Sequence, residues 1–163
     1  MTASRVTFAL ALLVAIGPPA WGQGVSELAG TWILDATTGV GRHVAPGMEV
    51  VGPYPSTLTI DVSASRVIVH KGSTILDREA YRLDGSETDV GGERKGTAAV
   101  ADGTLVLTTR RTRPDAGTNV FKEIYRVSGM VLTIERQLSV IQPDGTAREN
   151  IPSYRHTVVY RRN

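Results

Sequence analysis

The chain has 163 residues, a length that suits one domain at about 100–200 residues per domain. Its 18 basic and 16 acidic side chains give a net charge of +2, which predicts no general attraction to nucleic acid or to anionic membranes. The absence of cysteine excludes disulfides and thiol chemistry, so stability must come from packing of an apolar core.

The first 22 residues are typical of a secretory signal peptide. A basic residue precedes an apolar run over residues 6–17, and the small residues Ala20 and Gly22 form a cleavage pattern. The run is shorter than the roughly 20 residues that a membrane-spanning helix needs. We therefore expect cleavage after Gly22, export to the periplasm or the extracellular space, and a single domain over residues 23–163 without a transmembrane segment.

The remaining chain alternates between apolar and polar residues, which is the pattern of half-buried β-strands. In chain order, strands are expected over residues 30–35, 56–62, 65–71, 74–83, 96–100, 104–112, 119–127, 130–140 and 154–162. No amphipathic helix is expected, although Ser26 can cap a short turn. The glycine-rich segments 36–55 and 84–96 are interpreted as long loops, a class that is often functional.

The turns between these strands predict the topology. Asp102-Gly103 and Ser128-Gly129 are suited to two-residue hairpin loops, and short connections make consecutive strands antiparallel neighbours. The predicted fold is all-β, an antiparallel up-and-down β-barrel of about 8–10 strands, because closure removes exposed sheet edges; a β-sandwich is the alternative. A barrel of about eight or more strands can hold one small ligand.

The hairpin at Ser128-Gly129 predicts which side chains face inward. If Val127 opposes Met130, then Phe121 opposes Arg136, and Glu123 and Arg136 lie on the apolar face because the side-chain period is two. The apolar members of this face are Phe121, Tyr125, Val127, Met130, Leu132, Ile134 and Leu138.

The hairpin at Asp102-Gly103 pairs Val100 with Leu105 and so adds Thr109 and Arg111 to the inner face. An interior charge is costly unless it is paired. In one interpretation, Arg136, with Arg111, meets the acidic head of a ligand whose tail lies in the barrel. In the other, Glu123 and Arg136 form an internal pair or reach water at the rim. The candidate ligand-binding residues are Arg111, Glu123, Tyr125 and Arg136.

Known catalytic and metal-binding patterns are missing from the sequence. His43, His70 and His156 are far apart and have no neighbouring metal-ligand motif. The segment 91–97 shares only its glycines with a phosphate-binding loop, and no Gly-x-Ser-x-Gly elbow occurs. We therefore expect no cofactor, no metal, no catalytic residues and no enzymatic activity.

The segment "LAGTWILD" resembles the first-strand Gly-x-Trp signature of the lipocalins and the wider calycin group. With "LTIDVSASRVIV", "DGTLVLTTRR", "VLTIERQ" and the terminal "VVYRR", the chain is similar to exported bacterial lipocalin-like proteins of unassigned function. In that family the Trp packs at the closed barrel end under a late-strand Arg. The resemblance therefore implies a structural signature of Gly30 and Trp32 with Arg161 or Arg162, in which Gly30 allows a close backbone approach and Trp32 plugs the barrel.

The resemblance also implies a function, a monomeric exported barrel that binds a small hydrophobic or amphiphilic ligand such as an anionic amphiphile. The alternative is a protein-interaction or protease-inhibitor module with a filled barrel, because bacterial metalloprotease inhibitors are small exported barrels that begin with a similar segment. The usual lipocalin disulfide has no counterpart here, and the terminal "VVYRR" lacks the Arg-x-Tyr pattern of fatty-acid-binding proteins. The family therefore implies no ligand site residue by residue.

Overall fold

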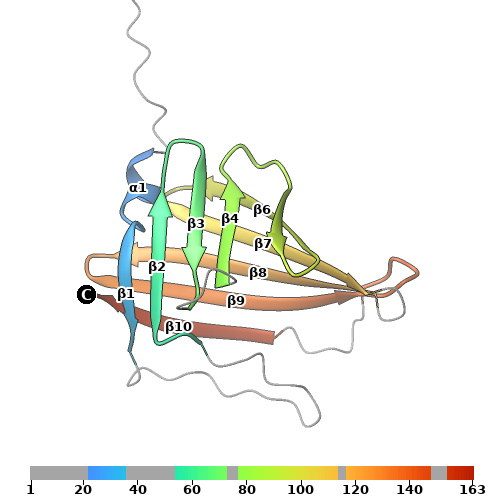
Figure 1. Ribbon diagram of the computed structural model, residues 1–163. Helices are drawn as coiled ribbons and strands as arrows, with labels where there is room; N and C mark the ends of the chain where they lie inside the picture. The colour runs from blue at the N-terminus through green and yellow to red at the C-terminus, as the bar shows by residue number, and fades with distance from the viewer. Residues whose placement is uncertain (1–21, 36–53, 73–76, 114–116, 148–153) are drawn as a thin grey trace, which may run out of the picture.

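A computed structural model describes residues 22–35, 54–72, 77–113, 117–147 and 154–163. These residues form one short helix and ten β-strands (Figure 1). The elements are α1 (Gly22–Ser26), β1 (Gly30–Leu34), β2 (Thr57–Val62), β3 (Arg66–His70), β4 (Arg78–Arg82), β5 (Thr88–Gly91), β6 (Arg94–Ala101), β7 (Thr104–Arg113), β8 (Gly117–Ser128), β9 (Val131–Ile141) and β10 (Tyr154–Arg162). In the described residues, no helix is long and apolar enough to span a membrane.

The strands form one antiparallel sheet in the order β4-β3-β2-β1-β10-β9-β8-β7-β6-β5. Most neighbours in this order are consecutive in the chain, and β1 pairs with β10, which brings the first and last strands together. The sheet curls into a nearly closed barrel, so the predicted up-and-down barrel is confirmed. Figure 1 shows the long strands β7, β8 and β9 extending beyond the short strands β1 to β4.

Side chains bridge the remaining gap between β4 and β5. The Thr88 hydroxyl donates to the carbonyl of Ala80 on β4 at 3.2 Å. The Tyr81 ring lies against Gly96 on β6, where an added Cβ would be 2.5 Å from Tyr81 Cε1. The glycine therefore lets a buried tyrosine fill the interior at the place where the ladder is interrupted.

Two elements were not expected from the sequence. The segment 84–96, interpreted as a loop, contains β5 and the first residues of β6, while α1 precedes the turn expected at Ser26. β5 is short and irregular, with a register shift between Asp89 and Gly91, so it has too few residues to display an alternating pattern. The other long loop, 36–55, lies outside the described residues except for its last two positions.

The two hairpins test the predicted registers. Asp102 and Gly103 have φ values of 49° and 70° and connect the paired residues Ala101 and Thr104, which confirms the first two-residue loop. The second register is wrong by two residues. Val127 opposes Leu132, so the loop is Gly129-Met130 and Met130 is 60% exposed.

The error in the second hairpin has a local cause. Gly129 adopts a positive φ of 59° at the first loop position, whereas the prediction put it at the second. A shift of two residues moves Met130 from its predicted inner position into the loop, but it keeps the paired side chains on their predicted face and changes their partners. Glu123 therefore lies opposite Arg136, and Phe121 lies opposite Leu138.

One end of the barrel is closed around Trp32. The Trp32 side chain is fully buried, and its Nε1 donates to the Leu28 carbonyl at 2.9 Å. The Arg162 guanidinium lies 4.7 Å from the Trp32 ring centroid and donates to the carbonyls of Glu27 and Ala29, while Arg161 pairs with Asp35 outside. Of the two terminal arginines, Arg162 is thus the one that covers the Trp.

Gly30 has a different role from the one expected. A Cβ added at Gly30 would meet no atom within 4 Å, so the residue does not serve a close backbone approach. Its φ of 135° is instead a conformation that other residues rarely adopt. The glycine therefore allows the bend that leads the chain from α1 into β1.

Candidate functional site

The interior of the barrel changes from apolar to charged along its axis. On β7, the inner side chains Leu105 and Leu107 are buried near the closed end, and they are followed by Thr109, Arg111 and Arg113. Because alternate residues of a strand share a face, the same succession recurs on neighbouring strands. It is seen in Val67, Val69 and, just after β3, Lys71, and in Ala98, Gly96 and Arg94 on β6. On β8, Tyr125 is followed by the charged Glu123 and then by Phe121.

A cavity of about 320 Å³ lies at this charged end, away from Trp32. Its lining residues are Lys71, Glu79, Gly92, Arg94, Thr109, Arg111, Arg113, Asn119, Phe121, Glu123 and Arg136. Five of these are basic and two are acidic, so the cavity has an excess of positive charge. Phe121 is the single large apolar residue among them.

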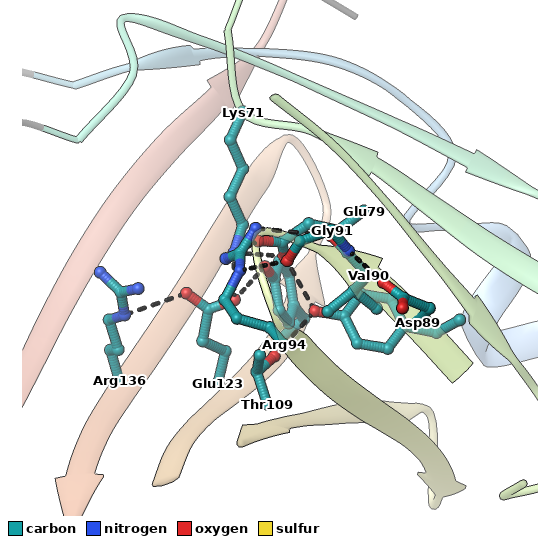
Figure 2. Close-up of polar contacts among 11 residues, drawn as sticks. Lys71, Glu79, Asp89, Val90, Gly91, Arg94, Thr109, Glu123 and Arg136 are labelled. Carbon is teal, nitrogen blue, oxygen red and sulfur yellow. Dashed lines mark hydrogen bonds and ion pairs between the residues drawn. The ribbon is translucent and has the colours of Figure 1, made fainter. Parts of the chain in front are cut away.

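Two buried carboxylates join three of the five cations into one network (Figure 2). Lys71 Nζ lies 2.8 Å from Glu79 Oε2 and 2.8 Å from Glu123 Oε2. Arg94 Nη1 donates to Glu79 Oε1 at 2.6 Å from the other side. Arg136 Nε lies 3.1 Å from Glu123 Oε1. Each carboxylate therefore contacts Lys71 and one arginine.

Tyrosine hydroxyls complete the hydrogen bonding beneath the cavity. Tyr81 donates to Glu79 Oε2 at 2.8 Å, and Tyr125 donates to Glu123 Oε2 at 2.9 Å. The Tyr81 oxygen is also 3.0 Å from the Thr109 hydroxyl. Because buried charges need several hydrogen-bond partners to offset lost hydration, these tyrosines stabilise the ionised carboxylates.

Two arginines retain hydrogen-bonding capacity. Arg136 lies over the Phe121 ring at 5.1 Å, and its Nε, although close to Glu123, lacks hydrogen-bond geometry. Arg111 Nε has no hydrogen-bond partner among the described residues, and its ion pair with Glu93 is long, at 3.9 Å. Guanidinium groups with free donors are suited to bind carboxylate or phosphate oxygens.

The network fixes the charge of its members. Burial opposes the ionisation of Glu79 and Glu123, but Lys71, and for Glu123 also Arg136, outweighs it, so the pKa of each carboxyl lies below its ordinary value of 4.5. Burial also opposes the charge on Lys71, yet the two glutamates raise its pKa above the ordinary 10.5. All three groups are therefore charged at neutral pH.

These shifts predict how stability depends on pH. Because the pKa values of Glu79 and Glu123 are lowered in the folded protein, their ionisation stabilises the fold. This stabilisation is fully present above pH 4.5 and is lost as the pH falls through the folded-state pKa values. The raised pKa of Lys71 contributes stability below 10.5 that is lost as pH rises further. We expect the urea midpoint to be highest between these values. Carboxyl carbon NMR shifts should place both glutamate midpoints below 4.5, and midpoints above it would contradict the network.

The predicted site residues are partly brought together. Arg111, Glu123 and Arg136 line the cavity, whereas Tyr125 lies beneath it and contacts Glu123. The internal pair of Glu123 and Arg136, one of the two interpretations drawn from the sequence, is present as part of a larger network. From the glycine-rich segment 84–96, Gly92 and Arg94 reach the cavity.

Several cavity residues were missed by the sequence analysis. They are Lys71, Glu79, Arg94, Arg113 and Asn119. The two-residue period that identified Arg111 would have found Arg113, and applied to β3 it would have found Lys71. Applied to the predicted strand 74–83, the same period would have placed Glu79 on the face of the buried Tyr81. Arg94 carries no such signal, because it lies in the segment 84–96, which was interpreted as a loop.

Comparison of the chain with protein-family models, with curated proteins and with solved structures gave no match. The fold and the cavity are therefore the basis for a functional proposal.

Proposed function

We propose that this barrel binds a small organic anion in the cavity at its charged end, with Arg136 meeting the acid group. The observation that carries the proposal is the excess of cations, five basic residues against two acidic ones, in a concave site. Positive charge gathered in a hollow with protein walls attracts anions more strongly than the same charge on an open surface.

The geometry around Arg136 supports a preorganised site. Its guanidinium is held between Phe121 at 5.1 Å and Glu123 at 3.1 Å, so little side-chain freedom remains to be lost on binding. The volume of about 320 Å³ falls at the lower end of the range of roughly 300–1,000 Å³ for small-molecule sites. Since Phe121 is the one large apolar lining residue, the lining favours the acidic end of the expected amphiphile over a long tail.

Binding is favoured over catalysis because both carboxylates of the cavity are ionised. A general acid–base pair needs two groups whose pKa values are pushed apart. Burial raises the pKa of Glu79 and of Glu123, but Lys71 outweighs it at both, so both pKa values are lowered instead of being pushed apart.

We further propose that the protein is an exported, lipocalin-like carrier. The proposal is supported by the signal-like first 22 residues and by the Gly-x-Trp of the first strand. A protease-inhibitor module with a filled barrel has less support, because the barrel contains a cavity at its charged end.

The proposal is tested by titrating the ¹⁵N-labelled protein with butyrate and with succinate at constant ionic strength. We expect saturable shifts at the backbone amides of Phe121, Glu123 and Arg136 and none at Trp32. Arg136→Gln should weaken binding by about tenfold or more, the effect of losing one charged hydrogen bond.

Arg126→Gln is the matched control. Arg126 lies on β8, is half exposed and pairs outside the cavity with Glu135 at 3.5 Å, so the variant has the same net charge and an intact cavity. We expect it to bind as the wild type does. Failure of both anions to give saturable shifts, or equal weakening in both variants, would refute an anion site.

A further inference from the structure

We infer that the ligand of this cavity is a compact polyanion, a polar molecule with at least two negative charges on oxygen atoms. The inference rests on the proposed anion site and names the class of its ligand. Its basis is the distribution of charge between the inner part of the cavity and its mouth.

In the inner part, the carboxylates do not balance the cations. Glu79 and Glu123 share Lys71 at 2.8 Å each, and each also contacts one arginine, Arg94 or Arg136. Two negative charges thus face three positive ones in a region where both glutamates are buried. One positive charge remains here for a ligand. We assign it to Arg136, whose Nε contact with Glu123 lacks hydrogen-bond geometry and whose side chain is 20% exposed.

At the mouth, two further cations are weakly compensated. Arg111 and Arg113 occupy successive inner positions of β7 beyond Thr109 and both line the cavity. The ion pair from Arg111 to Glu93 is 3.9 Å long, and the Glu93 side chain is 85% exposed, so solvent screens it. Arg113 forms no ion pair within the part of the chain that the structure describes, so the two like charges at the mouth have only the long contact to Glu93. A single negative charge bound at Arg136 does not change this.

The lining also limits the rest of the ligand. Apart from Phe121, the cavity presents charged and polar side chains or glycine, so an apolar chain has little surface to contact. A short molecule with one acid group near Arg136 and a second near Arg111 matches this arrangement. The two acid groups can be carboxylates or phosphates, because guanidinium groups bind both.

The test compares anions of equal chain length and different charge. Butyrate and succinate share a four-carbon chain, but succinate carries a second carboxylate. At constant ionic strength we expect succinate to bind at least about tenfold more tightly, as one added charged hydrogen bond implies. Inorganic phosphate is titrated in parallel. A higher affinity for phosphate than for succinate would assign phosphate groups to the ligand, and the reverse would assign carboxylates.

Arg111→Gln locates the second charge. This variant should lose more affinity for succinate than for butyrate, so the ratio between the two falls towards about twofold, the size of a weak surface contact. Arg110→Gln is the matched control, because Arg110 is the neighbouring residue on β7 and is exposed on the outer face. It should keep the ratio of the wild type. Circular dichroism and the urea midpoint verify that both variants are folded.

The outcomes separate this inference from the function on which it rests. If butyrate binds as tightly as succinate and Arg136→Gln weakens both, the anion site stands and the polyanion is refuted. If Arg110→Gln lowers the ratio as much as Arg111→Gln does, the effect is general electrostatics and the inference is refuted as well. If neither carboxylate nor phosphate binds, the proposed function itself fails.

Discussion

Trp32→Ala is expected to lower the free energy of unfolding by about 3–5 kcal/mol. The side chain is fully buried at the closed end, where it packs beneath Arg162 and donates to the Leu28 carbonyl. Its removal leaves a cavity, takes away the hydrogen bond that holds the segment before β1, and exposes the barrel end. Urea unfolding followed by far-ultraviolet circular dichroism measures the change without relying on tryptophan fluorescence.

Ile33→Ala is the control for this variant. Ile33 is the next residue on β1, but its side chain faces outward and is 40% exposed. We expect its truncation to cost less than about 1.5 kcal/mol, because little apolar surface is removed from the interior. A Trp32→Ala protein as stable as Ile33→Ala would show that the Trp does not close the barrel.

Glu123→Ala is expected to destabilise the protein by about 3 kcal/mol, the lower end of the range for breaking a buried ion pair. The truncation leaves Lys71 and Arg136 close together without their shared carboxylate, and the Tyr125 hydroxyl loses its acceptor. The lower end applies because the Lys71 and Arg136 side chains are 24% and 20% exposed, so water solvates them in part. The measurement is again the urea unfolding free energy, at neutral pH.

Two further variants show whether the cost arises from uncompensated charge. Asp61→Ala removes a carboxylate from β2 that is 62% exposed and contacts His70 at 3.1 Å outside the barrel, and it should cost less than about 1 kcal/mol. After Glu123→Ala, the three cations of the network face Glu79 alone. Adding Lys71→Met therefore lowers the excess of positive charge and should restore part of the lost stability. An additive double variant would mean that Lys71 and Glu123 do not interact.

Whether a strand or helix was predicted depended on whether its own residues show a recognisable pattern. The alternation over 104–112 and 119–127 recurs in β7 and β8, because a strand several residues long shows its period whatever its neighbours are. β5 was missed since it has four residues and a bulge, and the helix α1 was missed since it has only five. Both are held by their tertiary surroundings; in α1, for example, Val25 is buried in the core.

The candidate site was predicted in part. Arg111, Glu123 and Arg136 were assigned to the inner face from the two-residue period alone, and all three line the cavity. The same period could have placed Lys71 and Glu79 on the inner face of their own strands. It could not have predicted that Lys71 joins Glu79 to Glu123, because no pattern within a single strand reports a contact with a strand on the other side of the barrel.

By itself, the sequence determined the class of fold and the inner face of each long strand. It also determined that this face carries charges at the end of the barrel opposite to Trp32. Alternation and turn residues act through local backbone geometry, so a single chain segment carries them. Only the tertiary structure decided which charges meet. The hairpin loop at Gly129-Met130 put Glu123 opposite Arg136, and the curling of the sheet brought Lys71 between Glu79 and Glu123. A register shift of two residues preserves the face yet moves each partner by about 7 Å, which is more than an ion pair can span.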